Sequence, residues 1–386
     1  MRYAEVAACT LVAAACMPPS YGVILEAGAD DPTDTDTDTD TDTGEPPIEW
    51  HGEPLPLAEP GEWLWVDFPK NTRCRSGEPT GIGVRYADSD DLLIYFQGGG
   101  ACFHSLACLT NPQTADAAEF YGAWAPGLGR SGIFNDDHPA NPAADFNVVY
   151  VPYCSGDVFA GDREDVELEG LDPQQFVGYR NVTAFLDRVV PTFRGAPQVL
   201  IVGASAGGFG ASFNAIRIAR SFPESQVTLV NDSAPLFSDD YVAPCLQQRW
   251  RDVWGLDETI PAGCDACFNP DGGGLSNLFD HISAALPKVN FGLISATRDA
   301  TISIFYAFGV DACSGFGIFT GDQFQAGLYE LRERVLAPNG WGSYFIPANT
   351  HVWTQNSDFY NTEVAGAPLT DWLADLMAGD AAQVAP

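Results

Sequence analysis

Short, uninterrupted runs of apolar residues recur along the chain from about residue 48 onward. Because these runs lack the alternation of a half-exposed strand, they predict strands covered on both faces, as in a parallel sheet. Amphipathic or turn-rich stretches separate the runs, and residues 174–190 carry apolar side chains at helical spacing. The six predicted strands are Leu92–Phe96, Asn147–Val151, Val199–Val202, Val227–Val230, Phe291–Ile294 and Tyr344–Ile346. The alternation predicts an α/β fold with a doubly wound, mostly parallel sheet and helices on both faces.

The first 47 residues have a different character from the rest. Within residues 1–16, an uncharged stretch ends with Ala13-Ala14-Ala15-Cys16, and this pattern predicts an export signal. A Cys after small residues is also typical of bacterial lipoproteins, so a lipidated Cys16 is the one membrane attachment that the sequence offers. Residues 17–47 contain repeated Thr-Asp dipeptides and lack the Gly turn and mixed oxygen ligands of a calcium loop. We therefore expect an export signal (1–16), an acidic linker (17–47) and one globular domain (48–386) in a protein that is secreted or attached to the bacterial cell surface.

Composition narrows the classes of protein that remain. Hydrophobic residues make up 46% of the 386 residues and charged residues 18%, so most of the chain can bury a core and is not disordered. No apolar run approaches the roughly 20 residues of a membrane-spanning helix. The net charge of −34 disfavours a nucleic-acid partner, because an acidic surface repels phosphate backbones.

Eight cysteines lie outside the N-terminal apolar run, and their even number favours disulfides in an oxidising compartment. Cys264 and Cys267 have the spacing of half a zinc site, but zinc needs further ligands at matching spacing, so a disulfide is the preferred interpretation. The eight cysteines allow many pairings, and spacing does not choose among them. Cys102–Cys108 is the first candidate pair, because it would hold a glycine-rich loop discussed below.

The sequence Gly203-Ala204-Ser205-Ala206-Gly207-Gly208 follows a predicted strand and precedes a predicted helix at Phe209–Arg220. It satisfies the pattern G-x-S-x-G in the strand–turn–helix context in which this pattern carries a nucleophilic serine. Small neighbours are needed because the turn is strained, and the N–H groups at a helix start face developing negative charge. Ser205 is therefore the candidate nucleophile.

A nucleophilic serine needs a base, and an acid that orients the base. In α/β hydrolases the chain order is Ser, acid, His, and His351 follows the last predicted strand across a short loop. His281 lies in a predicted helix and is expected at the surface. Asp299 follows the preceding strand and is assigned as the acid, whereas Asp232, one strand earlier, is the rival that we assign to the pocket wall.

A run of glycines, Gly98-Gly99-Gly100, directly follows the strand Leu92–Phe96. Backbone N–H groups without side chains in the way are what an oxyanion hole requires. We expect Gly99 or Gly100, together with Ala206, to donate to the oxyanion. A phosphate-binding loop is disfavoured because the Lys-Ser/Thr pair and the G-x-G-x-x-G spacing are missing.

With these residues assembled, the chain resembles the pectin acetylesterase and Notum family of secreted α/β-hydrolase esterases. The stretches that carry the resemblance are Gly98–Cys102, Tyr153–Asp157, Gly203–Gly208 and the loop of His351. The resemblance implies a Ser205, Asp299 and His351 triad, and removal of a short acyl group from a carbohydrate or other small alcohol. It implies neither a cofactor nor a metal.

The chain departs from the family pattern at four positions, which are Ala101, Ser155, Ala204 and Val352. The substrate-pocket candidates are two of these, Ala101 and Ser155, together with Asp232, in a pocket beside Ser205. Because no long apolar lid is evident, we expect acetyl-like esters to be the best substrates. The alternatives are a non-catalytic surface protein on the same scaffold, and a fatty-acyl esterase, lipase or peptidase with the same triad.

Overall fold

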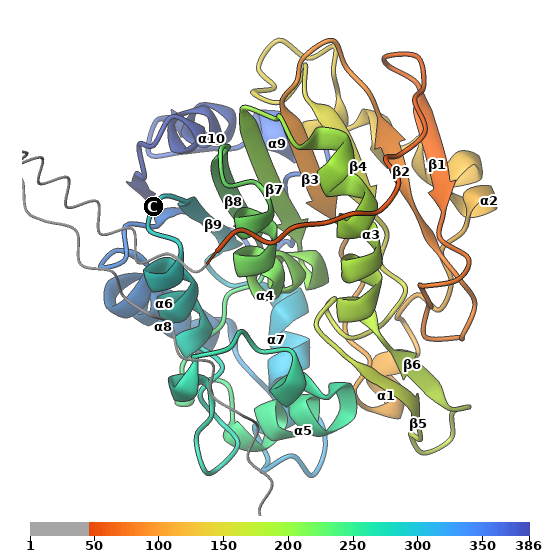
Figure 1. Cartoon of the computed structure of the whole chain (residues 1–386). Helices are drawn as coiled ribbons and strands as arrows, with labels where there is room; N and C mark the ends of the chain where they lie inside the picture. Colours follow the sequence, from red (N-terminus) through yellow and green to blue (C-terminus); the bar gives the residue numbers. More distant parts are fainter. Residues whose placement is uncertain (1–45) are drawn as a thin grey trace, which may run out of the picture. The chain divides into compact units, whose positions relative to one another are not determined.

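The computed structural model describes residues 46–386, and its centre is a nine-stranded sheet (Figure 1). The strand order is β1-β2-β4-β3-β7-β8-β9-β10-β13. Strand β2 runs antiparallel to β1 and β4, and all other neighbouring strands are parallel. The strands are β1 (Trp63–Asp67), β2 (Gly81–Arg85), β3 (Leu92–Phe96), β4 (Asn147–Val151), β7 (Gln198–Ala204), β8 (Gln226–Asp232), β9 (Asn290–Ala296), β10 (Gly342–Ile346) and β13 (Gln383–Val384). The predicted fold class is confirmed.

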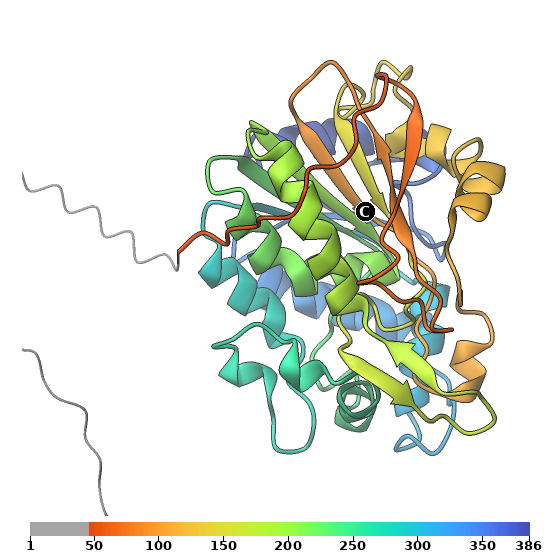
Figure 2. The ribbon, with the colours of Figure 1, turned by 45° about the vertical axis from the view of Figure 1, so that its right-hand side comes forward.

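All six strands predicted from apolar runs are present, and each lies in the interior of the sheet order. Strands β3 and β4 are buried along their whole length, because both faces of the sheet are covered. One face packs against α3 (Gly178–Phe193), α4 (Ala206–Ser221), α6 (Asn277–Ala285) and α8 (Gly321–Leu331). The other face packs against α9 (Asp358–Asn361) and α10 (Leu369–Met377), which lie behind the sheet in Figures 1 and 2.

The helix predicted from residue 174 begins later than expected. Gln174–Phe176 forms strand β6, which pairs antiparallel with β5 (Arg163–Val166), and helix α3 begins at Gly178. The Asp157 carboxylate accepts a hydrogen bond from the Gly178 N–H at 2.6 Å, and this contact marks the helix start. Phe176 is buried in the strand, so its apolar character fitted the helical spacing by coincidence.

The ends of the central strands lie side by side and bring distant segments together. Phe96 is paired with Gly203, Ala204 with Asp232, and Ala296 with Ile346. Beyond the sheet, Figure 1 shows the β5–β6 hairpin gathered with helices at one end of the described part. These helices are α1 (Ser105–Cys108), α5 (Pro244–Trp254) and α7 (Ala300–Tyr306). Other short elements include α2 (Ala117–Glu119) and the hairpin of β11 (Glu363–Val364) and β12 (Ala367–Pro368).

All eight cysteines of the described part form disulfides. The pairs are Cys74–Cys154, Cys102–Cys108, Cys245–Cys313 and Cys264–Cys267. The predicted Cys102–Cys108 pair is confirmed, and so is the preference for a disulfide over a zinc site at Cys264 and Cys267. Among the helices of residues 46–386, none is long and apolar enough to cross a membrane. The predicted export signal, Cys16 and nearly all of the predicted linker lie outside the described residues.

Candidate active site

Ser205 occupies a strained turn between strand β7 and helix α4. Its backbone has φ 56° and ψ −121°, a conformation that is costly for a residue with a side chain. The Ser205 N–H donates to the Asp232 carbonyl at 2.7 Å, which ties the turn to the end of strand β8. The side chain is only 8% exposed and stands at the first residue before the helix. These are the features of a nucleophile elbow.

The glycines around Ser205 are required because backbone segments meet there. A Cβ on Gly203 would lie 2.0 Å from the Gly207 carbonyl oxygen, and a Cβ on Gly207 would lie 2.0 Å from that of Phe96. A Cβ on Gly98 would lie 2.9 Å from the Ser205 Cβ. Small residues at these positions therefore allow the turn to pack directly against the glycine loop after β3.

His351 and Asp299 are in direct contact. The Nδ1 atom of His351 lies 2.6 Å from Oδ2 of Asp299, whose side chain is fully buried. The second carboxylate oxygen, Oδ1, accepts from the N–H groups of Thr301 and Ile302 at 2.9 Å each, so Asp299 also caps helix α7. Because this cap fixes the carboxylate, the imidazole ring is held with Nε2 on its far side.

The Nε2 atom of His351 is buried and has no hydrogen-bond partner within residues 46–386. The structure therefore joins His351 to Asp299, and His351 makes no hydrogen bond to Ser205. In unliganded sites such bonds are often long and tighten only when substrate binds. An unpartnered, buried ring nitrogen is available to accept a proton.

Asp232 lies behind the site instead of in the pocket wall, where the sequence placed it. Its Oδ2 accepts three hydrogen bonds of 2.8–2.9 Å, from the N–H groups of Trp353 and Thr354 and from the Thr354 hydroxyl. Its Oδ1 accepts from the Ser233 hydroxyl at 2.9 Å. Burial raises the pKa of this carboxyl, and the four hydrogen bonds oppose that rise. Asp232 therefore anchors the loop that follows His351.

The candidate oxyanion donors surround Ser205. Within the described residues, the N–H groups of Gly99, Gly100 and Ala206 donate to no protein acceptor. Ala206 is the first residue of α4, so its N–H lies at the positive end of the helix dipole. The free donor at the start of α4, together with the free donors of the glycine loop, can stabilise an anion beside the serine.

An apolar pocket opens beside Ser205. It encloses about 530 Å³ of atom-free space, part of it open to solvent. The pocket is lined by Gly100, Ala101, Val158, Ser205, Ala206, Phe209, Phe213, Leu236, Trp250, Trp254, Leu256, Leu275, Ile302, Phe305 and Tyr306. Ala101 faces this pocket, whereas Ser155 and Asp232 do not line it. Apart from the serine hydroxyl and the tyrosine, every lining side chain is hydrocarbon or indole.

Comparison with known protein families adds to this geometry. The family model of pectinacetylesterase matches residues 65–276, which are more than half of the chain. The chain belongs to the pectinacetylesterase family. The resemblance noted in the sequence is thereby confirmed. The matched range contains the glycine loop and Ser205, while Asp299 and His351 lie beyond it.

Curated relatives of this pectinacetylesterase-family chain carry the name palmitoleoyl-protein carboxylesterase NOTUM. The protein from Schmidtea mediterranea is 32% identical over 164 residues, which cover 40% of this chain and 30% of the relative. The notum1' protein from Xenopus laevis is 28% identical over 194 residues, 47% of this chain and 37% of the relative. The human protein is 27% identical over 168 residues, 42% and 33% of the two chains. The matches thus span about a third of the length of these relatives. Both the family and the relatives are named for carboxylic ester hydrolysis.

The four residues that depart from the family pattern lie in surroundings that differ from one residue to the next. Ser155 is buried and donates its hydroxyl to Asp157 at 2.6 Å. Burial raises the pKa of Asp157 to about 6, although the carboxylate accepts several hydrogen bonds. Ala204 is buried at the end of β7, and Val352 has a positive φ of 60° directly after His351. Of the four, only Ala101 reaches the pocket.

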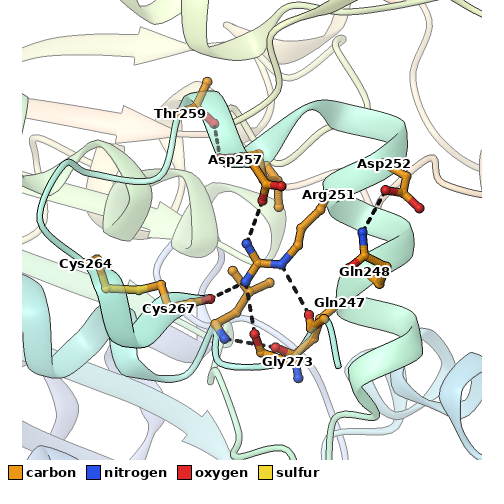
Figure 3. A network of polar contacts seen from close by, with 12 residues as sticks. Gln247, Gln248, Arg251, Asp252, Asp257, Thr259, Cys264, Cys267 and Gly273 are labelled. Atoms are coloured by element: carbon orange, nitrogen blue, oxygen red, sulfur yellow. Dashed lines mark hydrogen bonds and ion pairs between the residues drawn. A yellow bond between two sulfur atoms is a disulfide. The ribbon is translucent and has the colours of Figure 1, made fainter. Parts of the chain in front are cut away.

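One wall of the pocket depends on a buried arginine that the sequence analysis missed. Arg251 extends from helix α5 toward the loop of Cys267 and Gly273 (Figure 3). Its guanidinium donates to the carbonyls of Cys267, Gly272 and Gly273 and pairs with Asp257 at 2.8 Å. Trp250, Trp254 and Leu256 of the same segment, and Leu275 just after the loop, line the pocket. No motif marks such a residue, because its partners come from the loop that folds over the helix.

We expect Arg251→Met to destabilise the protein by about 3 kcal/mol or more, because three backbone carbonyls lose a buried donor at once. Thermal denaturation would measure the change, with Arg334→Met as the control. Arg334 is mostly exposed and pairs with Glu330, four residues before it on the helix surface, so its loss should cost about 0.5 kcal/mol or less. Equal effects of the two substitutions would contradict a supporting role for Arg251.

Proposed function

We propose that this protein is a carboxylic ester hydrolase that works through an acyl-enzyme on Ser205. In this proposal His351 is the general base and Asp299 the residue that orients it. The observation that carries the proposal is the 2.6 Å contact of His351 with a buried, cap-fixed Asp299, at the strand edge that bears Ser205. Membership of the pectinacetylesterase family and the named activity of the relatives support the same class of reaction.

The reaction would proceed by two acyl transfers. The Ser205 oxygen attacks the ester carbonyl as its proton passes to Nε2 of His351, and the buried Asp299 stabilises the imidazolium. The oxyanion that forms accepts hydrogen bonds from Ala206 and the glycine loop. His351 then gives the proton to the departing alcohol. A water molecule then attacks the acyl-enzyme in the same way, with His351 again accepting the proton. The carboxylic acid is released, and His351 returns the proton to Ser205.

The pocket favours a longer acyl group than the sequence analysis expected. That expectation of acetyl-like esters relied on the missing lid, but the walls of the pocket come from α5, α7 and the loop around Leu275. A surface built of Phe, Trp, Leu and Ile side chains gains about 0.8 kcal/mol for each methylene it buries. The six methylenes that separate acetate from octanoate are then worth about 5 kcal/mol if all are buried. We therefore propose a medium- or long-chain acyl ester as the substrate, which agrees with the palmitoleoyl group in the relatives' name.

A series of nitrophenyl esters with acyl groups from acetate to palmitate tests this proposal. We expect kcat/KM to rise at least 100-fold from acetate to octanoate, which corresponds to about 3 kcal/mol of the available burial energy. Leu275→Trp adds bulk to the pocket wall and should lower the ratio of octanoate to acetate activity. Leu328→Met, in the core but outside the pocket, is the matched control. A maximum at acetate would restore the short-chain interpretation.

A non-catalytic surface protein on the same scaffold is the competing function. Covalent labelling separates the two, because a fluorophosphonate reacts with an activated serine and leaves an ordinary one untouched. We expect one label per chain, on Ser205. A protein that neither takes up the label nor hydrolyses any ester of the series would contradict the esterase proposal.

We also propose that the protein is exported and that its alcohol component is an extracellular molecule, such as an acylated carbohydrate. Four disulfides support export, because such bonds persist in oxidising compartments and are rare in the cytosol of mesophiles. Under this proposal residues 48–386 are the catalytic domain, preceded by the signal (1–16) and linker (17–47) inferred from the sequence.

A further inference from the structure

The peptide bond between Gly99 and Gly100 carries one of the proposed oxyanion donors. In a trans peptide the carbonyl of one residue and the N–H of the next lie in one plane and point in opposite directions. The direction of the Gly99 carbonyl therefore determines where the Gly100 N–H points. Anything that holds this carbonyl also aims the donor.

Asn111 holds that carbonyl. Its side-chain Nδ2 donates to the Gly99 oxygen at 2.7 Å, across twelve residues of sequence. The Asn111 residue is only 4% exposed, so the bond is protected from competition by water. Neither the glycine motif nor the serine motif contains this residue, and the proposed mechanism does not use it.

The glycine loop needs such a support. Three successive glycines have more conformational freedom than any other residues, and Gly100 has a φ of 80°, which favours glycine. Side chains cannot supply the rigidity, because a Cβ on Gly99 would lie 2.6 Å from the Tyr153 ring. The loop must therefore be fixed from outside.

The support is itself rigid. The buried Arg75 guanidinium donates to the carbonyls of Cys108, Asn111 and Pro112 at 2.7–3.0 Å. The Asn111 N–H donates to the Cys108 carbonyl at 3.3 Å, and the Cys102–Cys108 disulfide closes the same loop. Asn111 is thus attached at its backbone and free to act only through its amide.

The oxygen of the Asn111 amide, Oδ1, shows that the amide is held through its nitrogen. Within the described residues, Asn111 Oδ1 is buried without a hydrogen-bond partner. A buried acceptor left unpaired costs free energy, so the amide is oriented by its donor. Rotation of the amide would place Oδ1 against the Gly99 oxygen, and the two would repel.

We propose that Asn111 is a positioning residue for ester hydrolysis, which aims the Gly100 N–H at the oxyanion by holding the Gly99 carbonyl. The inference rests on the proposed function. Asn111 does not line the pocket beside Ser205, so its effect on turnover should pass through the oxyanion hole. It should change the rate of the chemical step and leave substrate binding nearly intact.

Asn111→Asp tests the inference, because it removes the donor with almost no change of shape. We expect kcat to fall about 10- to 100-fold with KM nearly unchanged, less than the roughly 10²- to 10³-fold cost of deleting an oxyanion donor outright. The decisive readout compares an ester with its thionoester, whose sulfur accepts hydrogen bonds weakly. The substitution should slow the ester far more than the thionoester, so the rate ratio of the two substrates should fall toward one.

Asn147→Asp is the matched control. Asn147 is also buried and also donates to backbone carbonyls, those of Ser89 and Asp91, but it begins strand β4 at the opposite end from Ser205. It should lower stability without changing the ester to thionoester ratio. If Asn111→Asp does not fold, Asn111→Ser removes the same bond without adding a charge, because its hydroxyl is too short to reach Gly99.

The outcomes separate the two levels of the proposal. If the wild-type enzyme is active and neither Asn111 variant changes its ester to thionoester ratio, the inference is overturned and the esterase proposal stands. Equal losses on both substrates would assign Asn111 a general structural role and overturn the inference as well. A wild-type protein without esterase activity would overturn both.

Discussion

Replacing Ser205 with Ala should lower kcat/KM for nitrophenyl esters by about 10⁴- to 10⁶-fold, and His351→Ala should have a similar effect. The serine supplies the bond to the acyl group, and the histidine supplies a buried, unpartnered ring nitrogen that can take the proton. Because the two act as a unit, the double variant should be no worse than either single one. Steady-state kinetics on the best ester of the series measures all three.

Folding controls make that loss interpretable. Ser205 is 8% exposed and its hydroxyl makes no hydrogen bond within residues 46–386, so Ser205→Ala should melt at nearly the wild-type temperature. Ser225→Ala is the matched control, because Ser225 follows the far end of α4 and its hydroxyl donates to the Ala196 carbonyl. It should keep full activity. A folded Ser205→Ala protein with near-normal turnover would contradict the acyl-enzyme mechanism.

The central strands were predictable because a strand that is buried on both faces has an uninterrupted run of apolar residues. Strands β3 and β4 were predicted with their observed bounds, and β7, β8 and β9 extend only a few residues further. Strand β2, with the sequence Gly-Ile-Gly-Val-Arg, escaped prediction because its glycines interrupt the apolar run. Those glycines are needed, since a Cβ on Gly81 would lie 2.2 Å from the Val66 carbonyl oxygen of the neighbouring strand.

The residues at strand ends were likewise predictable, because position along the chain determines position along the sheet edge. Ser205, Asp299 and His351 each follow a strand of the same parallel set, and the pairing of these strands places them together. Asp232 satisfies the same rule and yet turns away, toward the backbone of residues 353 and 354. Sequence position gave its place on the edge but not the direction of its side chain.

The pocket walls and the supporting contacts could not be predicted. Leu275, Trp254 and Val158 meet only because loops of different strands fold over the same end of the sheet. Arg251 and Asn111 act on backbone carbonyls, and any residue can supply a carbonyl, so the sequence contains no pattern for such partners. The disulfides follow the same rule. Only the pairs close in sequence, Cys102–Cys108 and Cys264–Cys267, could be proposed from the sequence. The long-range pairs Cys74–Cys154 and Cys245–Cys313 became evident only from the fold.

Asp299→Asn should lower kcat by about 10⁴-fold while leaving the protein as stable as the wild type. The asparagine oxygen can keep the hydrogen bonds from Thr301 and Ile302 that begin α7, so the helix cap survives. Its NH₂ group would then face Nδ1 of His351 and act as a donor. To accept this hydrogen bond, the imidazole must adopt the tautomer with an unprotonated Nδ1. Its proton is then on Nε2, which can no longer accept the proton of Ser205.

Asp232→Asn provides the comparison that decides which carboxylate is the acid. Its oxygen can still accept from Trp353 and Thr354, and its NH₂ can donate to the Ser233 hydroxyl oxygen, so the loop after His351 keeps most of its anchor. We expect a loss of about tenfold or less in kcat, together with about 1–3 kcal/mol of stability from the weakened hydrogen bonds. Kinetics and thermal denaturation of both variants separate the two roles, because Asp299 should affect turnover alone and Asp232 mainly stability. A reversal would make Asp232 the orienting acid and leave the assignment of Ser205 intact.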